Sequence, residues 1–348
     1  MKRTGNLYYK IAEPDNLRLA FCKAVKGKQD RLEVMRFRVH FESNIMALRR
    51  EILEKKLKVG DYRFFYVHDP KKRLICAACF RERVLHHAIM NVCEQTLDAY
   101  AVFDSYACRK GKGGRKAIER AKGFSGRFPW YLKLDIAKYF NSIGYEILMR
   151  HLERRFKDRE LLDLFQRILN TYATQPGKGV PIGNLISQHM ANFYLGCFDH
   201  WIKEVKSIRG YVRYMDDFVV WGSKKEALKE ELDRIRQWLN ENLCLTLNPK
   251  IQLNRSSRGM PFLGCRIYPG AIRLATSSRK RFIRKFRNYE KAFLKGEWNE
   301  ETLSRHMTAL VEFTRGAESA GFRTNVISRF GGIDPQPSPG FSPKARTA

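Results

Sequence analysis

The stretch Gly210-Tyr-Val-Arg-Tyr-Met-Asp-Asp-Phe-Val-Val-Trp-Gly222 places two adjacent acids between two runs of β-branched and aromatic residues. Runs of this composition favour β-strands, and glycines commonly bound them. The stretch therefore predicts a tight β-hairpin with strands at 211–214 and 218–221, and with Met215–Asp217 at or beside its turn. Adjacent carboxylates repel each other, so an isolated Asp-Asp pair is usually a solvated acidic turn.

A third acid upstream changes that interpretation. Asp135 closes a second strand-like run, Trp130-Tyr-Leu-Lys-Leu-Asp135. Carboxylates at the ends of neighbouring strands can hold divalent cations, and two such cations form a site for phosphoryl transfer. Asp135, Asp216 and Asp217 are therefore the candidate catalytic and metal-binding residues.

The chain is strongly basic, because 66 Lys and Arg stand against 36 acids and give a net charge of +30. Such a chain commonly faces a polyanion, with nucleic acid as the first candidate and an anionic membrane surface as the second. There is no run of 18 apolar residues and no signal peptide, so we expect no membrane span and a cytoplasmic protein. The eight scattered cysteines favour free thiols over zinc or disulfides.

The predicted elements do not follow a regular βαβα order. Residues 1–60 predict a basic helical segment, and strands are expected at 62–67, 74–77, 243–247 and 251–254. Helices are expected at 144–156, 159–172, 190–205 and 223–239 and from Ser277 onward. This order favours an α+β fold in which helices back an antiparallel sheet, with the acids on its open face.

Three groups of cations are candidates for binding phosphates. Lys71, Arg73 and Arg83 lie on a predicted hairpin and at a helix start, where they could hold a triphosphate; on these residues alone a solvated charge run is the favoured interpretation. The glycine loop 106–114 suits close approach to a nucleic-acid backbone, or else is an ordinary flexible surface loop. Its cations are Arg109, Lys110 and Lys112.

The third group lies on the helix that begins near Ser277. One face of this helix is apolar and the other is basic, as expected for a module that packs on the protein and follows a phosphate backbone. Its candidate nucleic-acid contacts are Arg279, Lys280, Arg284 and Lys285.

Four motifs occur in the order found in reverse transcriptases: Asp135 with its following aromatics, the Pro181-Ile-Gly183 loop, Tyr214-Met-Asp-Asp217 and Phe262-Leu-Gly264. The chain resembles that family, which implies a right-hand polymerase fold with an antiparallel palm sheet. The resemblance implies a basic N-terminal helical extension at 1–60, fingers and palm at 61–275, a basic helical thumb at 276–330 and a disordered tail at 331–348.

The resemblance also implies roles for the acids. Asp135 and Asp216 would be the principal ligands of two Mg²⁺ ions, for which Mn²⁺ could substitute, with help from the Ile136 carbonyl. Asp217 would be the second carboxylate of the hairpin. The reaction implied is extension of a primer 3′-OH with deoxynucleotides, in which positioning and charge neutralisation dominate.

A nucleotide site is implied in the same way. Here the match favours triphosphate binding by the hairpin cations over a solvated charge run. Phe140 falls at the position where an aromatic ring excludes a ribonucleotide 2′-OH, and this argues against an RNA polymerase. The implied nucleotide-binding residues are Lys71, Arg73, Arg83, Ile136, Ala137, Phe140, Ile182, Gly183 and Lys250.

One departure from the family pattern narrows the expectation. Most reverse transcriptases carry Gln-Gly-x-x-x-Ser-Pro where this chain has Ile182-Gly-Asn-Leu-Ile-Ser-Gln188. The variant resembles the enzymes of diversity-generating retroelements, which are bacterial or phage-borne. They copy a template-repeat RNA inaccurately at adenines and work with a small basic accessory variability protein. The alternatives are a retron-like or phage-defence reverse transcriptase, and a non-catalytic RNA-binding protein, against which the three intact acids argue.

Overall fold

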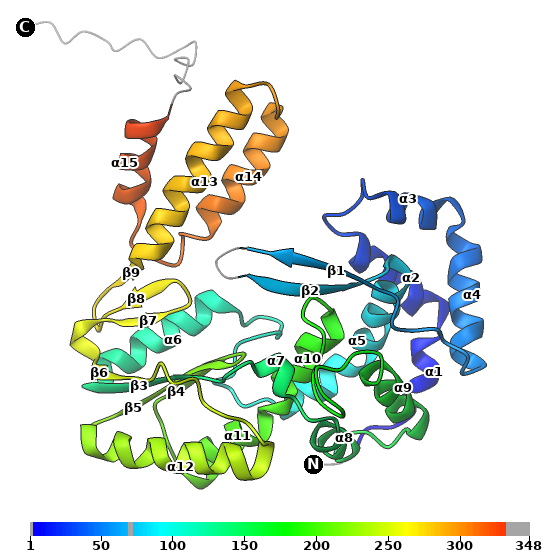
Figure 1. Ribbon diagram of the computed structural model, residues 1–348, viewed down its shortest axis with the longest axis horizontal. Coiled ribbons are helices and arrows are strands. Elements are labelled where there is room, and N and C mark those ends of the chain that lie inside the picture. Colours follow the sequence, from blue (N-terminus) through cyan, green and yellow to red (C-terminus); the bar gives the residue numbers. More distant parts are fainter. Residues whose placement is uncertain (1–2, 69–71, 332–348) are drawn as a thin grey trace, which may run out of the picture.

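The computed structural model describes residues 3–68 and 72–331 (Figure 1). The predicted nucleotide-binding residue Lys71, and residues 332–348 of the predicted tail, lie outside that part. Helices and antiparallel sheets are mixed along the chain, as predicted. Within the described residues, no helix combines the length and the apolar composition needed to cross a bilayer.

A four-stranded antiparallel sheet lies at the centre of the fold. Its strand order is β4 (Tyr211–Tyr214), β5 (Asp217–Gly222), β3 (Trp130–Asp135) and β6 (Gln252–Arg255). The predicted strand at 130–135 and the predicted hairpin are confirmed, and β3 pairs with β5.

Alternating side chains explain how this sheet is buried. Leu132 and Leu134 point into the main hydrophobic core, whereas Tyr131 enters a smaller core on the opposite face. Helix α12 (Lys225–Leu243) packs on β3, β5 and β6, and helix α6 (Gly114–Arg127) packs on β4. The residues of β3 on the same face as Tyr131 are Lys133 and Asp135, so the acid lies on the side away from the main core.

The N-terminal helices are integrated with the rest of the fold. A two-stranded ribbon, β1 (Tyr62–Val67) with β2 (Arg73–Ala78), extends from these helices toward the middle of the molecule (Figure 1). The helices are α1 (Tyr8–Ile11), α2 (Pro14–Val25), α3 (Leu32–Val39), α4 (Phe41–Leu53) and α5 (Phe80–Tyr100). The sequence predicted a helical segment at 1–60 without placing a helix at α2, which packs along α5 and shares the main core with the central sheet. Its buried residues, Leu17, Ala20, Phe21, Ala24 and Val25, follow the helical period, but two of them are alanines, which weaken the apolar signal.

Short helices connect β3 to β4 of the central sheet. They are α7 (Tyr139–Ser142), α8 (Tyr145–Glu153), α9 (Arg159–Leu169), α10 (Leu185–Tyr194), α11 (Gly196–His200) and a π-helix (Trp201–Val205). The helix predicted at 190–205 is divided at Leu195, and at Gly196 an added Cβ would lie 2.6 Å from the Tyr100 ring. Close packing against α5 thus accounts for the glycine at this break.

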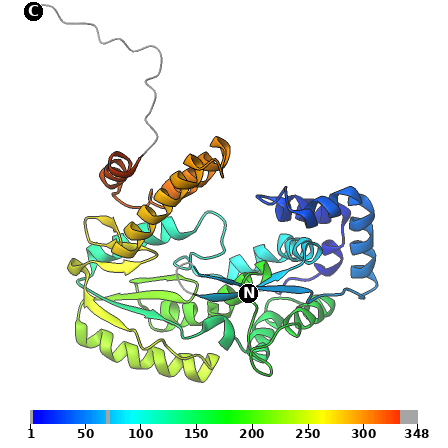
Figure 2. The ribbon, with the colours of Figure 1, turned by 45° about the horizontal axis from the view of Figure 1, so that its top comes forward.

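The C-terminal part comprises a small sheet and three helices. The elements are a 3-10 turn (Ser256–Arg258), β7 (Met260–Phe262), β8 (Cys265–Ile267), β9 (Ile272–Leu274), α13 (Thr276–Leu294), α14 (Glu300–Glu312) and α15 (Ala320–Phe330). Both views show α13–α15 and the N-terminal helices at opposite ends of the molecule (Figures 1 and 2). The strand predicted at 243–247 is wrong, because α12 runs through Leu243 and only an isolated bridge joins Leu247 to Ile136.

Candidate active site

The candidate site is built on the two-residue turn between β4 and β5. Tyr214 pairs with Asp217, which leaves Met215 and Asp216 as the turn. Met215 has φ 60°, and a positive φ at the first turn residue is a feature of the tight turns that match the twist of a hairpin. The turn therefore presents Asp216 at the end of the hairpin and Asp217 at the start of β5.

The three acids predicted from the sequence are brought together. Asp135, the last residue of β3, is the register partner of Asp217 on β5. Burial raises the pKa of Asp216, and the negative charge of Asp135 raises it further. Burial also raises the pKa of Asp217, to about 6, although Lys133 opposes this change. The site thus concentrates negative charge where water is scarce.

Two residues that we did not predict contact these acids. Lys133 Nζ lies 2.7 Å from Asp217 Oδ1, and this pairing partly offsets the cost of burying the carboxylate. Asn248 donates its backbone N–H to the Asp135 carbonyl at 2.8 Å and its side-chain amide to Asp135 Oδ2 at 3.3 Å. Lys133 could have been found from its position two residues before Asp135, on the same face of the strand. Asn248 follows a loop and gives no such signal.

The donor set fits a hard divalent cation. Mg²⁺ is commonly held by one or two carboxylates together with waters and substrate phosphates, rather than by a complete protein cage. In the part of the chain that the structure describes, no three His, Cys, Asp or Glu side chains form a ready-made metal site. The fit therefore rests on the crowded carboxylates Asp135 and Asp216, whose mutual repulsion a bound cation would relieve.

Arg73, a cation of the β1–β2 ribbon, acts electrostatically on these acids. It begins β2, its side chain is exposed, and its positive charge lowers the pKa of Asp216. Phe140 lies in α7 and is partly exposed, whereas its neighbours Tyr139 and Ile143 are buried in the core. This contrast agrees with a surface role for Phe140.

For three other predicted nucleotide contacts, the structure shows backbone contacts within the protein. The Ala137 N–H donates to the Thr246 carbonyl at 2.9 Å, so this donor is already used within the protein. Ile136 is buried and forms an isolated bridge with Leu247. Lys250 is exposed, and the structure shows its backbone, not its ammonium group, bonded to Asn248.

The Ile182-Gly183 loop is attached to the ribbon. The Cys76 N–H donates to the Ile182 carbonyl at 2.8 Å, and the Ala78 N–H donates to Asn184 Oδ1 at 3.1 Å. Gly183 has φ +117°, and an added Cβ would lie 2.7 Å from Ile75 Cγ2. Only glycine allows the loop to approach β2 this closely.

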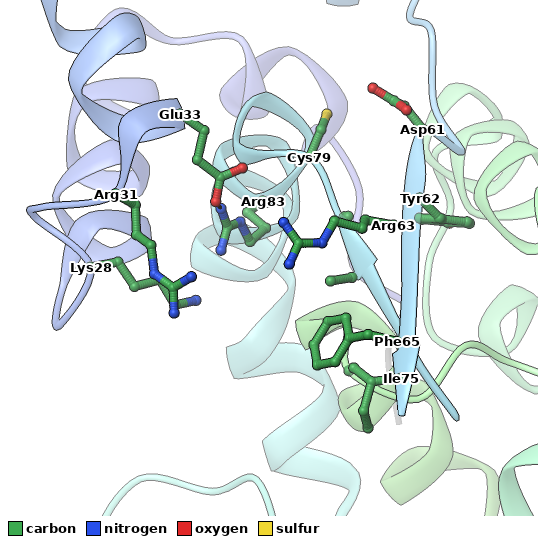
Figure 3. Close-up of a pocket in the computed structure, with 13 residues that line it drawn as sticks. Lys28, Arg31, Glu33, Asp61, Tyr62, Arg63, Phe65, Ile75, Cys79 and Arg83 are labelled. Atoms are coloured by element: carbon green, nitrogen blue, oxygen red, sulfur yellow. Dashed lines mark hydrogen bonds and ion pairs between the residues drawn. The ribbon is translucent and has the colours of Figure 1, made fainter. Parts of the chain in front are cut away.

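A pocket of about 630 Å³ lies between this ribbon and the N-terminal helices (Figure 3). Phe65, Ile75 and Gly183 line one part of it, and cations line another. The cations are Lys28, Arg31, Arg63 and Arg83. The predicted triphosphate contact Arg83 is thus found in this pocket, where its guanidinium pairs with Glu33 of α3 (Figure 3).

Arg109, a predicted nucleic-acid contact, is already engaged within the protein. Arg109 donates to Asp98 and to the carbonyls of Val102 and Ser105, and only 11% of its side chain is exposed, so the protein itself uses its donors. Lys110 remains 85% exposed beside Glu94. Lys112 lies 3.4 Å above the exposed Phe103 ring and donates to the Phe103 carbonyl.

The basic face of α13 is better placed for an external ligand. Arg279, Lys280 and Arg284 are exposed, and Lys285 is half-buried. Lys280 and Arg284 line a shallow hollow of about 270 Å³, whereas Arg279 lies 4.9 Å from the Phe322 ring of α15. The apolar face of the same helix buries Phe282 and Phe286.

A family model described as "Reverse transcriptase (RNA-dependent DNA polymerase)" matches residues 67–267. This match covers more than half of the chain, and the chain belongs to that family. The matched residues include every strand of the central sheet and all three acids.

The chain is also similar to several curated proteins. Protein YkfC of Escherichia coli is 25% identical over 276 residues, covering 64% of this chain and 72% of YkfC. Nuclear intron maturase 4 of Arabidopsis thaliana is 25% identical and covers 55% of this chain and 24% of the maturase. A putative COX1/OXI3 intron 1 protein of Saccharomyces cerevisiae is 23% identical; the match covers 46% of this chain and only 21% of the yeast protein.

A solved structure supports the fold. Apo telomerase from Candida tropicalis superposes with a TM-score of 0.50 at 13% identity, covering 77% of this chain and 59% of the telomerase chain. The chain therefore has a right-hand polymerase fold, as the sequence motifs predicted.

Proposed function

We propose that the chain is an RNA-directed DNA polymerase that extends a primer 3′-OH with deoxynucleotides along an RNA template. The observation that carries this proposal is the register of Asp135 against Asp217, with Asp216 in the adjoining turn. Arg73 supplies positive charge toward this group of acids. Acids beside a phosphate-binding cation suit the transfer of a nucleotidyl group.

The residues would act mainly by positioning. Two Mg²⁺ ions, held chiefly by Asp135 and Asp216, would neutralise the phosphate charge and favour the attacking 3′-oxygen when bound. Arg73 would bind the triphosphate, and Phe140 would lie against the sugar and exclude a 2′-OH. Lys133 keeps Asp217 charged and oriented, since the two side chains form an ion pair at 2.7 Å.

We assign the parts of the hand on the same basis. Fingers and palm would occupy 61–275, and α13–α15 would form the thumb at 276–330. The exposed cations Lys280 and Arg284 would follow the phosphates of the template and primer duplex. Residues 1–60 would extend the fingers, since they share the hydrophobic core with α5.

Primer extension tests the polymerase assignment directly. The chain should extend a labelled DNA primer annealed to RNA when Mg²⁺ and all four deoxynucleotides are present. Asp216→Ala should abolish extension while changing RNA affinity less than twofold, because the acid serves chemistry rather than binding. Asp233→Ala is the matched control, since Asp233 is an exposed acid on α12 paired with Arg236. Equal extension by wild type and Asp216→Ala would refute the metal assignment.

We further propose that the enzyme is the error-prone polymerase of a diversity-generating retroelement. Support comes from Ile182, whose carbonyl ties the loop to β2 and whose side chain is partly exposed. A Gln at this position could hydrogen-bond near the nascent base pair, whereas Ile can only pack. Losing such a bond, worth about 1–2 kcal/mol, would loosen nucleotide selection by about tenfold.

The test is to sequence cDNA made by wild type and by Ile182→Gln. We expect the wild-type errors to concentrate opposite template adenines and to fall several-fold in the variant. An unchanged error spectrum would show that this residue does not set fidelity. A retron-like or defence role predicts instead a structured noncoding RNA or toxin gene nearby, and no adenine-variable repeat.

A further inference from the structure

Arg213 of β4 is a fully buried cation whose donors are all engaged. Its guanidinium makes a two-pronged contact with Asp199 of α11, with Nε donating to Oδ1 at 2.7 Å and Nη2 to Oδ2. Nη1 donates to Asn192 Oδ1 at 2.9 Å, and Nη2 donates to Ser105 Oγ and to the Asn192 carbonyl, each at 3.1 Å. Arginine has five N–H donors in a fixed plane, so this geometry leaves the side chain one orientation.

One contact reaches the candidate active site. Nη1 of Arg213 also donates to the Met215 carbonyl at 2.9 Å. Met215 is the first residue of the catalytic turn and has φ 60°, a region that residues other than glycine seldom adopt. The Met215 carbonyl and the Asp216 nitrogen belong to the same planar peptide. The orientation of this carbonyl therefore fixes the Asp216 backbone from which the carboxylate side chain extends.

The partners of Arg213 are themselves fixed. Asp199 is fully buried and accepts a third hydrogen bond, from the Tyr211 hydroxyl, at 2.6 Å. Asn192 of α10 donates to the Ala107 carbonyl at 3.0 Å. The guanidinium is therefore anchored to α10, α11 and the segment around Ser105, and only its bond to Met215 reaches outward to the turn.

A purely structural role would not require that outward bond. The backbone of Arg213 already pairs with Phe218 of β5, and the pairing of Tyr214 with Asp217 already closes the hairpin. A buried ion pair can often be replaced by apolar residues without loss of stability, so burial does not explain the arginine. The need to hold the Asp216 carboxylate to within a fraction of an ångström does explain the arginine.

We propose that Arg213 is a positioning residue, which fixes Asp216 for catalysis by holding the Met215 carbonyl in the turn. The inference rests on the proposed polymerase activity. Arg213 touches neither substrate nor reacting atoms, and it acts through the peptide between Met215 and Asp216. A small displacement of a catalytic group can cost on the order of 100-fold in rate.

Two variants test this role. Arg213→Lys keeps a cation opposite Asp199 but loses the planar fork that reaches Met215. The double variant Arg213→Met with Asp199→Leu removes both buried charges and keeps a similar volume. For each, we expect kcat of primer extension to fall about 10- to 100-fold, and the Mg²⁺ concentration for half-maximal rate to rise. The deoxynucleotide KM should change less than twofold, because the triphosphate contacts are intact.

Tyr211→Phe is the matched control, because it removes one hydrogen bond to Asp199 without touching the turn. It should keep kcat and the Mg²⁺ dependence within twofold of wild type, with melting temperatures recorded for all variants. The proposal is wrong if either folded Arg213 variant retains wild-type kcat and Mg²⁺ dependence, or if Tyr211→Phe loses both equally. Failure of the wild-type chain to extend any primer would refute the polymerase assignment instead.

Discussion

Two buried polar clusters of the molecule differ in how well their hydrogen-bonding groups are satisfied. Arg213 and Asp199 are paired through two hydrogen bonds, and neighbours take up the remaining donors. Glu82 and His86 on α5 are equally buried, but His86 Nε2 lies 3.5 Å from Glu82 Oε1. Within the described chain, neither ring nitrogen of His86 and not Oε1 of Glu82 has a hydrogen bond.

The difference separates a fixed part of the molecule from a more adjustable one. The satisfied cluster contacts the turn that carries Asp216, where, on the proposed function, orientation decides the rate. The unsatisfied cluster lies beneath the pocket, since Glu82 accepts the Gly60 N–H next to the pocket residues Asp61 and Tyr62. Partly satisfied buried groups contribute little net stability, so this region can rearrange at lower cost.

The largest expected effect compares removal of one member from each cluster. Asp199→Ala leaves the Arg213 guanidinium buried without its counter-ion, which should lower the free energy of unfolding by about 3–5 kcal/mol. His86→Leu removes a buried group that makes no hydrogen bond, and should leave that free energy within about 1 kcal/mol of wild type. Urea unfolding at pH 7.5 measures both.

The two substitutions are controls for each other, because each removes a fully buried titratable side chain. Similar losses of stability in the two variants would contradict the contrast between the clusters. A loss confined to Asp199→Ala would support it.

The second prediction concerns the glycine that joins the pocket to the Ile182 loop. Gly183→Ala combines φ +117° with a Cβ placed 2.7 Å from Ile75, so it should cost about 2–4 kcal/mol. Gly177→Ala is the matched control, because its φ is +70° and nothing lies within 4 Å of the added atom. It should cost only about 1–2 kcal/mol, the strain of a left-handed residue. Thermal unfolding of both variants measures the difference, and equal costs would show that β2 yields to the added methyl.

The third prediction separates two cations that the sequence placed in the same role. Arg73→Ala should raise the deoxynucleotide KM about tenfold, the worth of a charge-assisted hydrogen bond. Arg83→Ala should raise it less than threefold, since its guanidinium pairs with Glu33 in the pocket. Steady-state kinetics on a homopolymer RNA template measures both, and the reverse ranking would place the triphosphate in the pocket instead.

The sequence predicted those parts of the site that local patterns encode. The strand-forming composition of the runs was sufficient for β3 and for the hairpin, and motif order was sufficient for the fold. The pattern of β4 shows Arg213 only as a polar residue within a strand, and gives no sign that α10 and α11 supply its partners. Nothing in the composition of the 106–114 loop shows that Arg109 is engaged by Asp98 of α5 and by the nearby carbonyls of Val102 and Ser105. Side chains that serve tertiary networks cannot be told from surface cations by composition.

The smallest expected effect is a pH dependence that comes from His86. Burial, together with a smaller effect of the charge of the neighbouring His87, lowers the pKa of His86 to about 3 from an ordinary value of 6.5; Glu82 also faces the ring at 3.5 Å. The folded chain therefore keeps this ring neutral, while the unfolded chain takes up its proton as the pH falls below 6.5. The free energy of unfolding contributed by His86 is complete above pH 6.5, and is lost progressively between pH 6.5 and 3.

Between pH 7.5 and 5.5, wild type should lose about 1.4 kcal/mol more than His86→Leu does. Because burial raises the pKa of Glu82 in both proteins, its own contribution largely cancels in this difference. Urea unfolding at the two pH values measures this difference in stability. Equal losses in wild type and variant would contradict the prediction. They would mean that Glu82 or water accommodates the protonated His86 ring, so that this cluster is better satisfied than its geometry indicates.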